Sequence, residues 1–413
     1  MALDSIGAAG ANATSRASGD TLHPSGAHSL TTREPSFVER NRRELELSDI
    51  EFEVFQGAGV HNYAALFDML RTFPSIAELG VDVPRLARSA ARRLPESIRA
   101  GLAADSPRRA ARPAHAGGTL APQGARGRPG QPVARAAPAA VAMRAATPSA
   151  MVATSGRAGP PLKAIDLRMH NWPVRDQGDR GTCAAFSAIA CREHLARSHG
   201  RHGVVLSAQY LYWATKTRVD PAPHAESTFL KYVCDALSQF GACDDGHWPY
   251  DGTVMANNVT HESPPALPST HARTDALTWR HAGTAAAPTP PGSAAAAVLA
   301  ILRSGRPVAA SLPMFKDPSG AYPTNWETAF AYDFGSVMDP PVSAISALGH
   351  AVCITGFVPD PSEAQGGYFI VRNSWGPGWG AQPATAGFLS PEVGYGQISA
   401  SYVENYLWEL LAL

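Results

Sequence analysis

The sequence is divided by a long stretch that cannot form a packed core. Residues 106–160 are rich in Ala, Pro, Gly and Arg, and no Asp or Glu occurs between Asp105 and Asp166. Such a segment buries too little apolar surface to offset the entropy that a chain loses on folding. It therefore predicts a flexible basic linker, with folded parts on either side of it.

The parts that flank this linker differ in pattern. Residues 1–45 are rich in Ala, Ser, Gly and Thr without a sustained period, which predicts disorder. Within 46–105 apolar residues recur at three- and four-residue steps, which predicts a small helical module of unknown role. The clearest run is Tyr63, Leu66, Phe67, Leu70 and Phe73. Residues 161–413 have the composition of a globular domain.

Within this domain the predicted helices come first and the strands later. Helices are expected from Thr182, from Ser207, over the run ESTFLKYVCDALSQF that starts at Glu226, and over 293–304. Strands are expected over 307–312, 350–358 and 367–372. This order is typical of a segregated α+β architecture.

Charge and hydropathy exclude several classes of protein. The formal net charge is zero, which gives no general attraction to nucleic acid or to anionic membranes. The arginines of 106–160 lack interleaved aromatic residues that would stack on bases, so no nucleic-acid partner is expected. No apolar run of about 18 residues occurs, so no membrane span is expected. The first 20 residues lack the basic and apolar regions of a secretory signal.

The five cysteines, at positions 183, 191, 234, 243 and 353, are an odd number and widely spaced. This favours free thiols in a reducing compartment over a disulfide framework, although a Cys234–Cys243 pair remains open. No His and Cys spacing typical of zinc occurs. The sequence therefore predicts neither a metal nor a cofactor.

Cys183 has the setting that thiol catalysis requires. It follows Gly178, Gly181 and Thr182 and precedes an Ala-rich helical run, so it is expected in the first turn of a helix. Free backbone N–H groups at a helix N-terminus favour a thiolate. Gln177, six residues earlier, can direct its amide to the same place. That amide and the Cys183 N–H would form an oxyanion hole.

The partners of such a thiol are predicted on two strands. His350 opens one predicted strand and is the candidate base, and Asn373 ends another. The Asn373 oxygen can accept the second N–H of the imidazole and so fix its orientation. Trp375 can shield this hydrogen bond from water.

These residues resemble the motifs of the papain family of cysteine peptidases, and the resemblance covers about 162–413. The matching elements are Asp176-Gln177-Gly178 with Cys183, His350-Ala351-Val352, and Asn373-Ser374-Trp375-Gly376 with Trp379-Gly380. The resemblance implies a two-lobe fold, with a helical lobe that carries the cysteine and an antiparallel β-barrel-like lobe that carries the histidine and asparagine. It implies a peptidase that forms a thioester acyl-enzyme on protein or peptide substrates.

Departures from the family pattern imply a divergent bacterial branch. Arg180-Gly181-Thr182-Cys183-Ala184 stands where the family often has Cys-Gly-Ser-Cys-Trp, and Glu226-Ser227-Thr228 stands near the place of Cys-Asn-Gly-Gly. Gly349 resembles a wall of the S2 pocket and leaves room for a bulky apolar P2 residue, so Gly349 and Trp375 are the substrate-binding candidates. The location is expected to be cytoplasmic or reached by a non-classical bacterial export route.

Two alternatives accompany the peptidase hypothesis. The same triad can serve a deamidase or acyltransferase effector, and a binding module with a dead site is disfavoured by the intact triad. The N-terminal helical module, for its part, is either an intramolecular inhibitor of the cleft or an accessory module unrelated to activity.

Overall fold

The computed structural model describes residues 34–96, 98–99, 162–252, 267–288, 292–319, 323–381 and 392–413. The predicted linker 106–160 lies outside these residues, as do residues 1–33 of the segment predicted to be disordered.

The N-terminal helical module comprises residues 34–99. Its helices are α1 (Phe37–Asn41), α2 (Asp49–Gly57), α3 (Tyr63–Thr72), the 3-10 helix η1 (Pro74–Leu79) and α4 (Val83–Arg93). The module begins before the predicted boundary at residue 46. Ser36 and Glu39 form a capping box that starts α1, and Phe37 and Val38 are buried in the module's core.

The module packs against the globular domain through apolar and polar contacts. Its core includes Met338, and Ala64 and Ala65 of α3 lie in a second cluster with Phe330. The Ser75 N–H donates to the Asp317 carboxylate across 3.0 Å. The module is therefore held by segments that precede the strand of His350.

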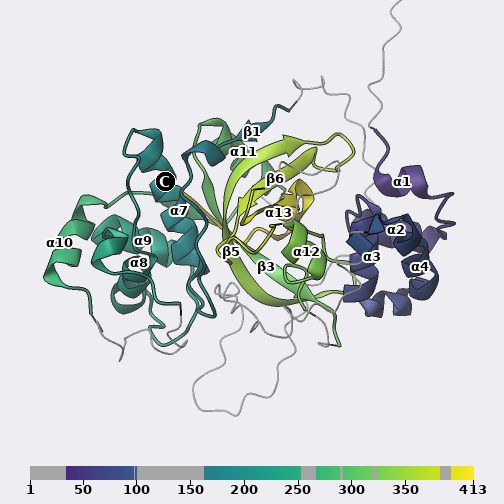
Figure 1. Ribbon diagram of the computed structural model, residues 1–413, viewed down its shortest axis with the longest axis horizontal. Coiled ribbons are helices and arrows are strands. Elements are labelled where there is room, and N and C mark those ends of the chain that lie inside the picture. The colour runs from purple at the N-terminus through teal and green to yellow at the C-terminus, as the bar shows by residue number, and fades with distance from the viewer. Residues whose placement is uncertain are drawn as a thin grey trace, which may run out of the picture. The chain divides into compact units, whose positions relative to one another are not determined.

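The helical lobe of the globular domain is built around α7 (Cys183–Ser198), whose residues up to Ala196 are all buried. Figure 1 shows α7 grouped with its neighbours on one side of the strands. These neighbours are α8 (Ala208–Ala214), the π-helix η3 (Thr215–Val219), α9 (Leu230–Phe240) and α10 (Thr270–Thr278). Short 3-10 helices lie at η2 (Arg168–His170) and η4 (Asp245–His247). The helix expected from Ser207 is α8, and the Ser207 side chain caps its start.

The second lobe is a mainly antiparallel sheet of eight strands, with the order β2-β8-β3-β5-β6-β7-β4 and β1 paired to β5. The strands are β1 (Ile165–Asp166), β2 (Thr284–Ala286), β3 (Val308–Lys316), β4 (Ser336–Val337), β5 (Ile345–Pro359), β6 (Gly367–Arg372), β7 (Tyr395–Ser399) and β8 (Glu409–Ala412). Only the β4–β7 pair is parallel among these ladders. Helices α11 (Ala294–Arg303), α12 (Ala329–Phe334) and α13 (Ala400–Tyr406) complete this part of the chain. The predicted α+β class is confirmed.

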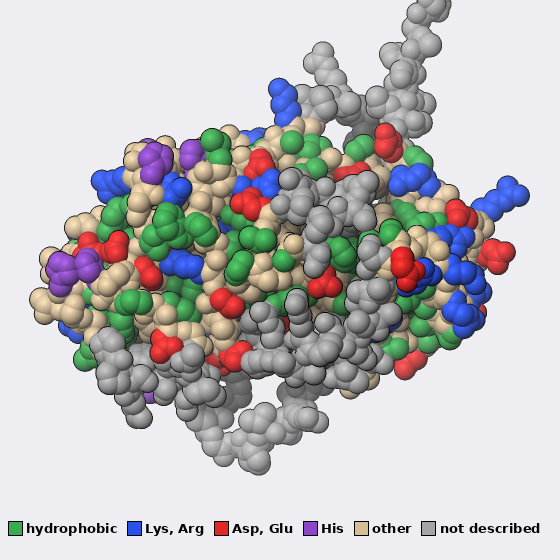
Figure 2. Space-filling model, viewed as in Figure 1, with side chains coloured by type: hydrophobic (Ala, Val, Ile, Leu, Met, Phe, Trp, Pro, Cys, Tyr) green, Lys and Arg blue, Asp and Glu red, His purple; other side chains and the backbone are tan. Residues whose placement is uncertain are grey.

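The two lobes meet where α7 packs against the sheet. Ala351 and Cys353 of β5 and Ala309 of β3 belong to the hydrophobic core of the helical lobe. The start of α7 therefore lies beside the middle of β5. No helix among the described residues is long and apolar enough to cross a bilayer. On the face shown in Figure 2, basic and acidic side chains are interspersed.

Candidate active site

Cys183 is the first residue of α7 and has no exposed surface. The loop before it is held by Tyr250, whose hydroxyl donates to the Gln177 carbonyl at 2.7 Å and lies 2.7 Å from the Thr182 hydroxyl. Gly178 has φ of +59°, and a Cβ there would lie 2.7 Å from the Gly252 carbonyl oxygen, so this turn requires glycine. The loop and the helix thus present Cys183 as the sequence predicted, in the first helical turn.

His350 lies in the interior of β5, opposite Leu312 of β3, and not at the start of a strand. The prediction was wrong in this detail because residues 345–348 are largely exposed and lack the apolar run of a buried strand. The next residue along the strand, Ala351, donates its N–H to the Cys183 sulfur across 3.4 Å. The histidine strand and the thiol are therefore in direct contact.

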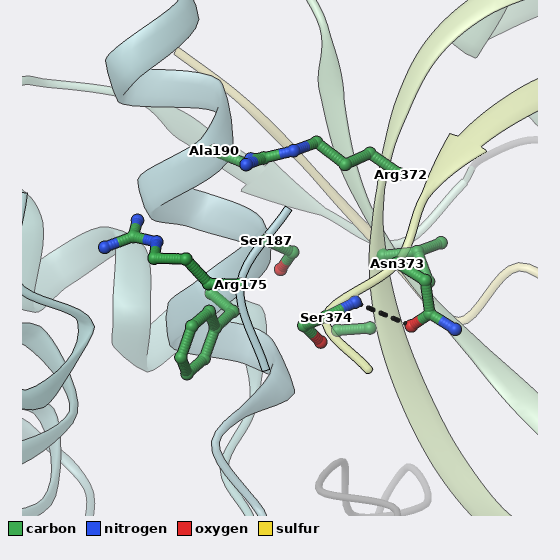
Figure 3. A pocket seen from close by; sticks show the side chains of 9 residues that line it. Arg175, Ser187, Ala190, Arg372, Asn373 and Ser374 are labelled. Atoms are coloured by element: carbon green, nitrogen blue, oxygen red, sulfur yellow. Dashed lines mark hydrogen bonds between the residues drawn. The ribbon is translucent and has the colours of Figure 1, made fainter. Parts of the chain in front are cut away.

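Asn373 follows β6, and its side-chain oxygen lies 2.8 Å from Nε2 of His350. The backbone N–H of Ser374 also donates to this oxygen, across 2.8 Å, as the dashed line in Figure 3 shows. Because a backbone N–H can only donate, the atom that it faces is the amide oxygen. Nε2 of His350 therefore carries the proton of this hydrogen bond, and Nδ1 is the nitrogen left for proton exchange.

Two tryptophans enclose the imidazole. The Trp375 ring lies 4.7 Å from the His350 ring, centroid to centroid, and the Trp326 ring lies 5.4 Å from it. Neither tryptophan has exposed surface. The pair keeps water from the His350–Asn373 hydrogen bond, which strengthens the bond by lowering the local dielectric. The sequence predicted this position for Trp375, but Trp326 stands in no recognisable motif.

Gln177 is buried, and its side-chain amide is hydrogen-bonded both to the loop before Cys183 and to the loop after β6. Its Nε2 donates to the Arg180 carbonyl at 2.7 Å, and its Oε1 accepts from the Ser374 hydroxyl at 2.6 Å. Because a carbonyl only accepts, this pair of contacts fixes the orientation of the amide. One N–H of Nε2 remains beyond the Arg180 bond. Ser374 stands within a motif that the sequence singled out, but its bond to Gln177 was not predicted.

A small cavity lies behind these residues, between α7 and strands β5 and β6. Figure 3 shows Ser187 and Ala190 of α7 on one side and Arg372, Asn373 and Ser374 on the other. Arg372 donates to the carbonyls of Trp172 and Pro173 at 2.8 and 2.9 Å. The cavity thus belongs to the framework that holds the two motif loops together.

The two substrate-binding candidates have different positions. Gly349 is buried in β5, opposite Pro313 of β3, and the neighbouring Leu348 is 43% exposed. Trp375 is buried against His350.

All five cysteines are free thiols, so Cys234 and Cys243 do not pair. Cys191 and Cys353 lie with their sulfurs 3.6 Å apart in the core. Burial raises the pKa of the Cys191 and Cys234 thiols, and it raises that of Cys243 to about 12. Within the described ranges no group of three or more His, Cys, Asp or Glu side chains is arranged to hold a metal ion.

The sequence is similar to those of known cysteine proteases. Residues 162–388 match the family described as "Papain family cysteine protease". An uncharacterized peptidase C1-like protein of Acanthamoeba polyphaga mimivirus is 24% identical over 216 residues, which are 50% of this chain and 60% of that protein.

Two solved structures illustrate the similarity. Xylellain, a cysteine protease from Xylella fastidiosa, is 20% identical and aligns over 62% of this chain and 86% of its own, with a TM-score of 0.46. A digestive procathepsin L2 proteinase from the larval midgut of Tenebrio molitor is 19% identical over 62% of this chain and 69% of its own, with a TM-score of 0.41.

Proposed function

Since the chain belongs to the papain family of cysteine proteases, we propose that it hydrolyses peptide bonds with Cys183 as the nucleophile. One observation carries the assignment of the site. The Ala351 N–H donates to the Cys183 sulfur at 3.4 Å, while the preceding His350 is bonded to Asn373 at 2.8 Å. The proposed nucleophile thus lies against the strand that carries the proposed base, and that base is bonded to its orienting group, as covalent acyl transfer requires.

In the acylation step, the Cys183 thiolate attacks the carbonyl carbon of the scissile bond. The electron pair of the carbonyl moves to its oxygen, and the Cys183 N–H and the second Nε2 hydrogen of Gln177 stabilise the oxyanion. When the C–N bond breaks, His350 gives its Nδ1 proton to the leaving amine, and a thioester remains.

In the deacylation step, His350 removes a proton from a water molecule that attacks the thioester. The acid leaves, the thiolate is restored and His350 holds the proton again. Asn373 and Trp375 do no proton transfer in this scheme. They keep Nδ1 of the imidazole directed at the reacting atoms.

We also propose that the substrate side of the cleft takes an apolar residue beside Gly349. Leu348 supports this, because it is exposed and alternation along a strand puts it on the same face of β5 as His350, two residues later. Gly349 lies between them and by the same alternation faces the other side of the strand, as Ala351 does toward the helical lobe, where it adds no side chain. We assign Trp375 to the wall of the site through its contact with His350.

We further propose that the N-terminal helical module restrains this activity. In the full chain Cys183, His350 and Gln177 have no exposed surface, so substrate reaches the sulfur only after part of the chain moves. The module is docked on the segments that lead into β5, through Ser75 on Asp317 and through Ser75 on Ser343, each at 3.0 Å. Release of the module would loosen the segments that position the histidine strand.

Covalent labelling tests the assignment of the nucleophile. A thiol-directed epoxide should add once to the wild-type protein, at Cys183, and should not add to the Cys183→Ala variant. The other thiols should stay unlabelled because none of them begins a helix beside His350, and burial raises the pKa of Cys191, Cys234 and Cys243 and so disfavours their reactive thiolates. The experiment is run on the full chain and on chain nicked by elastase in the Ala-rich segment 106–160, with the elastase then blocked. Labelling of Cys183→Ala at the wild-type rate would contradict the assignment.

A further inference from the structure

Glu226 is fixed beside the loop that leads to the nucleophile. Its Oε1 accepts the Gly181 N–H across 3.0 Å. A Cβ on Gly181 would lie 2.8 Å from Cγ of Glu226 and 3.1 Å from its carbonyl oxygen, so the two residues are in close contact. The hydroxyl of Tyr212 donates to that same carbonyl oxygen. The side chain of Glu226 is therefore anchored two residues before Cys183.

The charge of Glu226 is not neutralised within the described part of the chain. Glu226 takes part in none of the ion pairs of the described residues. Two cations nearby have other partners: Nη1 of Arg180 donates to Gln209 at 2.6 Å and to the Asp251 carbonyl at 2.8 Å, and Nζ of Lys216 donates to Asp220 and to the Ser227 carbonyl. A carboxylate that accepts one N–H keeps acceptor capacity for a further charged donor.

The position of this carboxylate defines which part of a substrate it meets. The carbonyl under attack lies between the Cys183 sulfur and the oxyanion donors of Cys183 and Gln177, so the residue that supplies it, P1, lies over the loop 177–183. Gly181 is within that loop, and its Cα is at most about 7.6 Å from that of Cys183. A long side chain at P1 can therefore reach the carboxylate.

We propose that Glu226 is a specificity-determining residue that selects arginine or lysine at P1. The inference rests on the proposed peptidase function and adds the substrate class. An ionic hydrogen bond between a guanidinium or ammonium group and this carboxylate forms only with a basic P1 side chain, and arginine can make it in bidentate form. A neutral or acidic P1 residue leaves the carboxylate without that partner.

The chain itself contains sequence of this chemical class. The segment 106–160 has no acidic residue that would oppose binding beside Glu226. Its arginines are Arg108, Arg109, Arg112, Arg126, Arg128, Arg135, Arg144 and Arg157. A peptide copy of residues 124–137, GARGRPGQPVARAA, is therefore a suitable probe.

The test is a set of peptides identical except at P1, which is Arg, Lys, Gln, Ala or Glu, together with the 124–137 peptide. The full chain and the elastase-nicked, elastase-blocked chain are both assayed, each as wild type, Glu226→Gln and Asp179→Asn. Glu226→Gln keeps an oxygen that can accept the Gly181 N–H, so it removes the charge and preserves the anchor. Asp179 is an exposed acid of the same loop and is the matched control. Cys183→Ala, treated in the same way, gives the blank.

We expect wild type to cleave the Arg and Lys peptides with a kcat/KM at least tenfold above the Gln peptide, the scale of one ionic hydrogen bond. In Glu226→Gln this ratio should fall to about one, and in Asp179→Asn it should stay within twofold of wild type. Raising the salt concentration should lower the ratio in wild type and in Asp179→Asn, and should leave it unchanged in Glu226→Gln. The role of Glu226 is overturned if Glu226→Gln cleaves the peptides with the wild-type ratio of kcat/KM for Arg over Gln. It is also overturned if the preference for a basic residue lies at a position other than P1. If neither sample cleaves any peptide, the proposed function itself fails.

Discussion

The Ser374 hydroxyl donates to Oε1 of Gln177 across 2.6 Å, and the Gln177 N–H donates to the Ser374 carbonyl across 2.8 Å. These two residues come from distant motif loops, one on each lobe. The bonds fix the orientation of the Gln177 amide, which is the side-chain donor that we propose for the oxyanion hole. Ser374 is thus a positioning residue for Gln177.

Loss of the amide should therefore cost more than loss of the hydroxyl. Gln177→Ala should lower kcat by about 10²–10³, the effect of one lost oxyanion donor. Ser374→Ala should lower kcat less and leave KM nearly unchanged, because the amide remains. Steady-state kinetics on one peptide decides this. A fully active Gln177→Ala, or a larger loss in Ser374→Ala, would show that the oxyanion hole has been assigned wrongly.

The different roles proposed for His350 and Asn373 predict different losses of kcat. His350→Ala removes the proposed proton-transfer group, whereas Asn373→Ala removes the oxygen that lies 2.8 Å from its Nε2. We expect both variants to lose kcat and His350→Ala to lose more. Thermal unfolding is measured alongside, because Asn373 also accepts the Ser374 N–H. Equal activity of Asn373→Ala and wild type would argue against an orienting role.

The docked module offers a third test. Ala64 of α3 is buried in the cluster that includes Phe330 of α12, so Ala64→Asp buries an unpaired charge at this contact. If the module restrains the enzyme, peptide hydrolysis and epoxide labelling of Cys183 should both become faster. Ala77→Asp is the matched control, because Ala77 is exposed on the same module. Proteolysis shows whether the module is displaced in Ala64→Asp. If it is displaced and both rates are unchanged, the module does not restrain the enzyme and is an accessory module.

The buried carboxylate of Asp339, which lies close to Gly59 of the module, should make stability depend on pH. Burial, reinforced by the nearby Glu363 and opposed by a 2.6 Å hydrogen bond from Ser399, raises the pKa of Asp339 to about 8. In the unfolded chain this pKa is about 3.9. Between these values the native state binds a proton that the unfolded state does not, so stability falls as pH rises from about 4 to about 8.

The variant Asp339→Asn isolates this contribution. Its amide oxygen can still accept from Ser399, but it does not titrate. As pH is raised from 5 to 8, the Tm of wild type should fall relative to the Tm of Asp339→Asn. The Tm of Asp179→Asn should fall in parallel with that of wild type. A Tm difference that is constant over this range would mean that Asp339 ionises normally in the native state.

The sequence predicted the elements whose patterns are local. Helix α7 begins after a glycine-rich loop with an Ala-rich run, and strand β6 is a short apolar segment with clear ends, so their positions were visible. For β3 only the start was predicted, because the strand expected over 307–312 continues to Lys316. The start of β5 was not, because Ile345 and Leu348 are exposed and the strand is defined by its pairing with β3. Pairing across distant segments leaves no local pattern.

The same distinction applies to the site. The candidates Gln177, Cys183, His350 and Asn373 were recognisable because each stands in a motif, and the fold brings them into one cluster. The contacts of Ser374, Trp326 and Glu226 depend on which loops face one another, and nothing near them in sequence predicted those contacts. Helix α1 was missed because its five residues differ from the polar chain before it only by a capping box and two buried side chains.

Cleavage of peptide bonds through Cys183 can be observed without a designed substrate, by mass spectrometry of a peptide mixture. Wild type, as full chain and as nicked chain, is incubated with the mixture beside Cys183→Ala treated identically. We expect new peptide N- and C-termini to accumulate with time in wild type and to be absent in Cys183→Ala. Termini that accumulate equally in Cys183→Ala would contradict it, as would a wild-type protein that modifies side chains or transfers acyl groups while no peptide bond is cut.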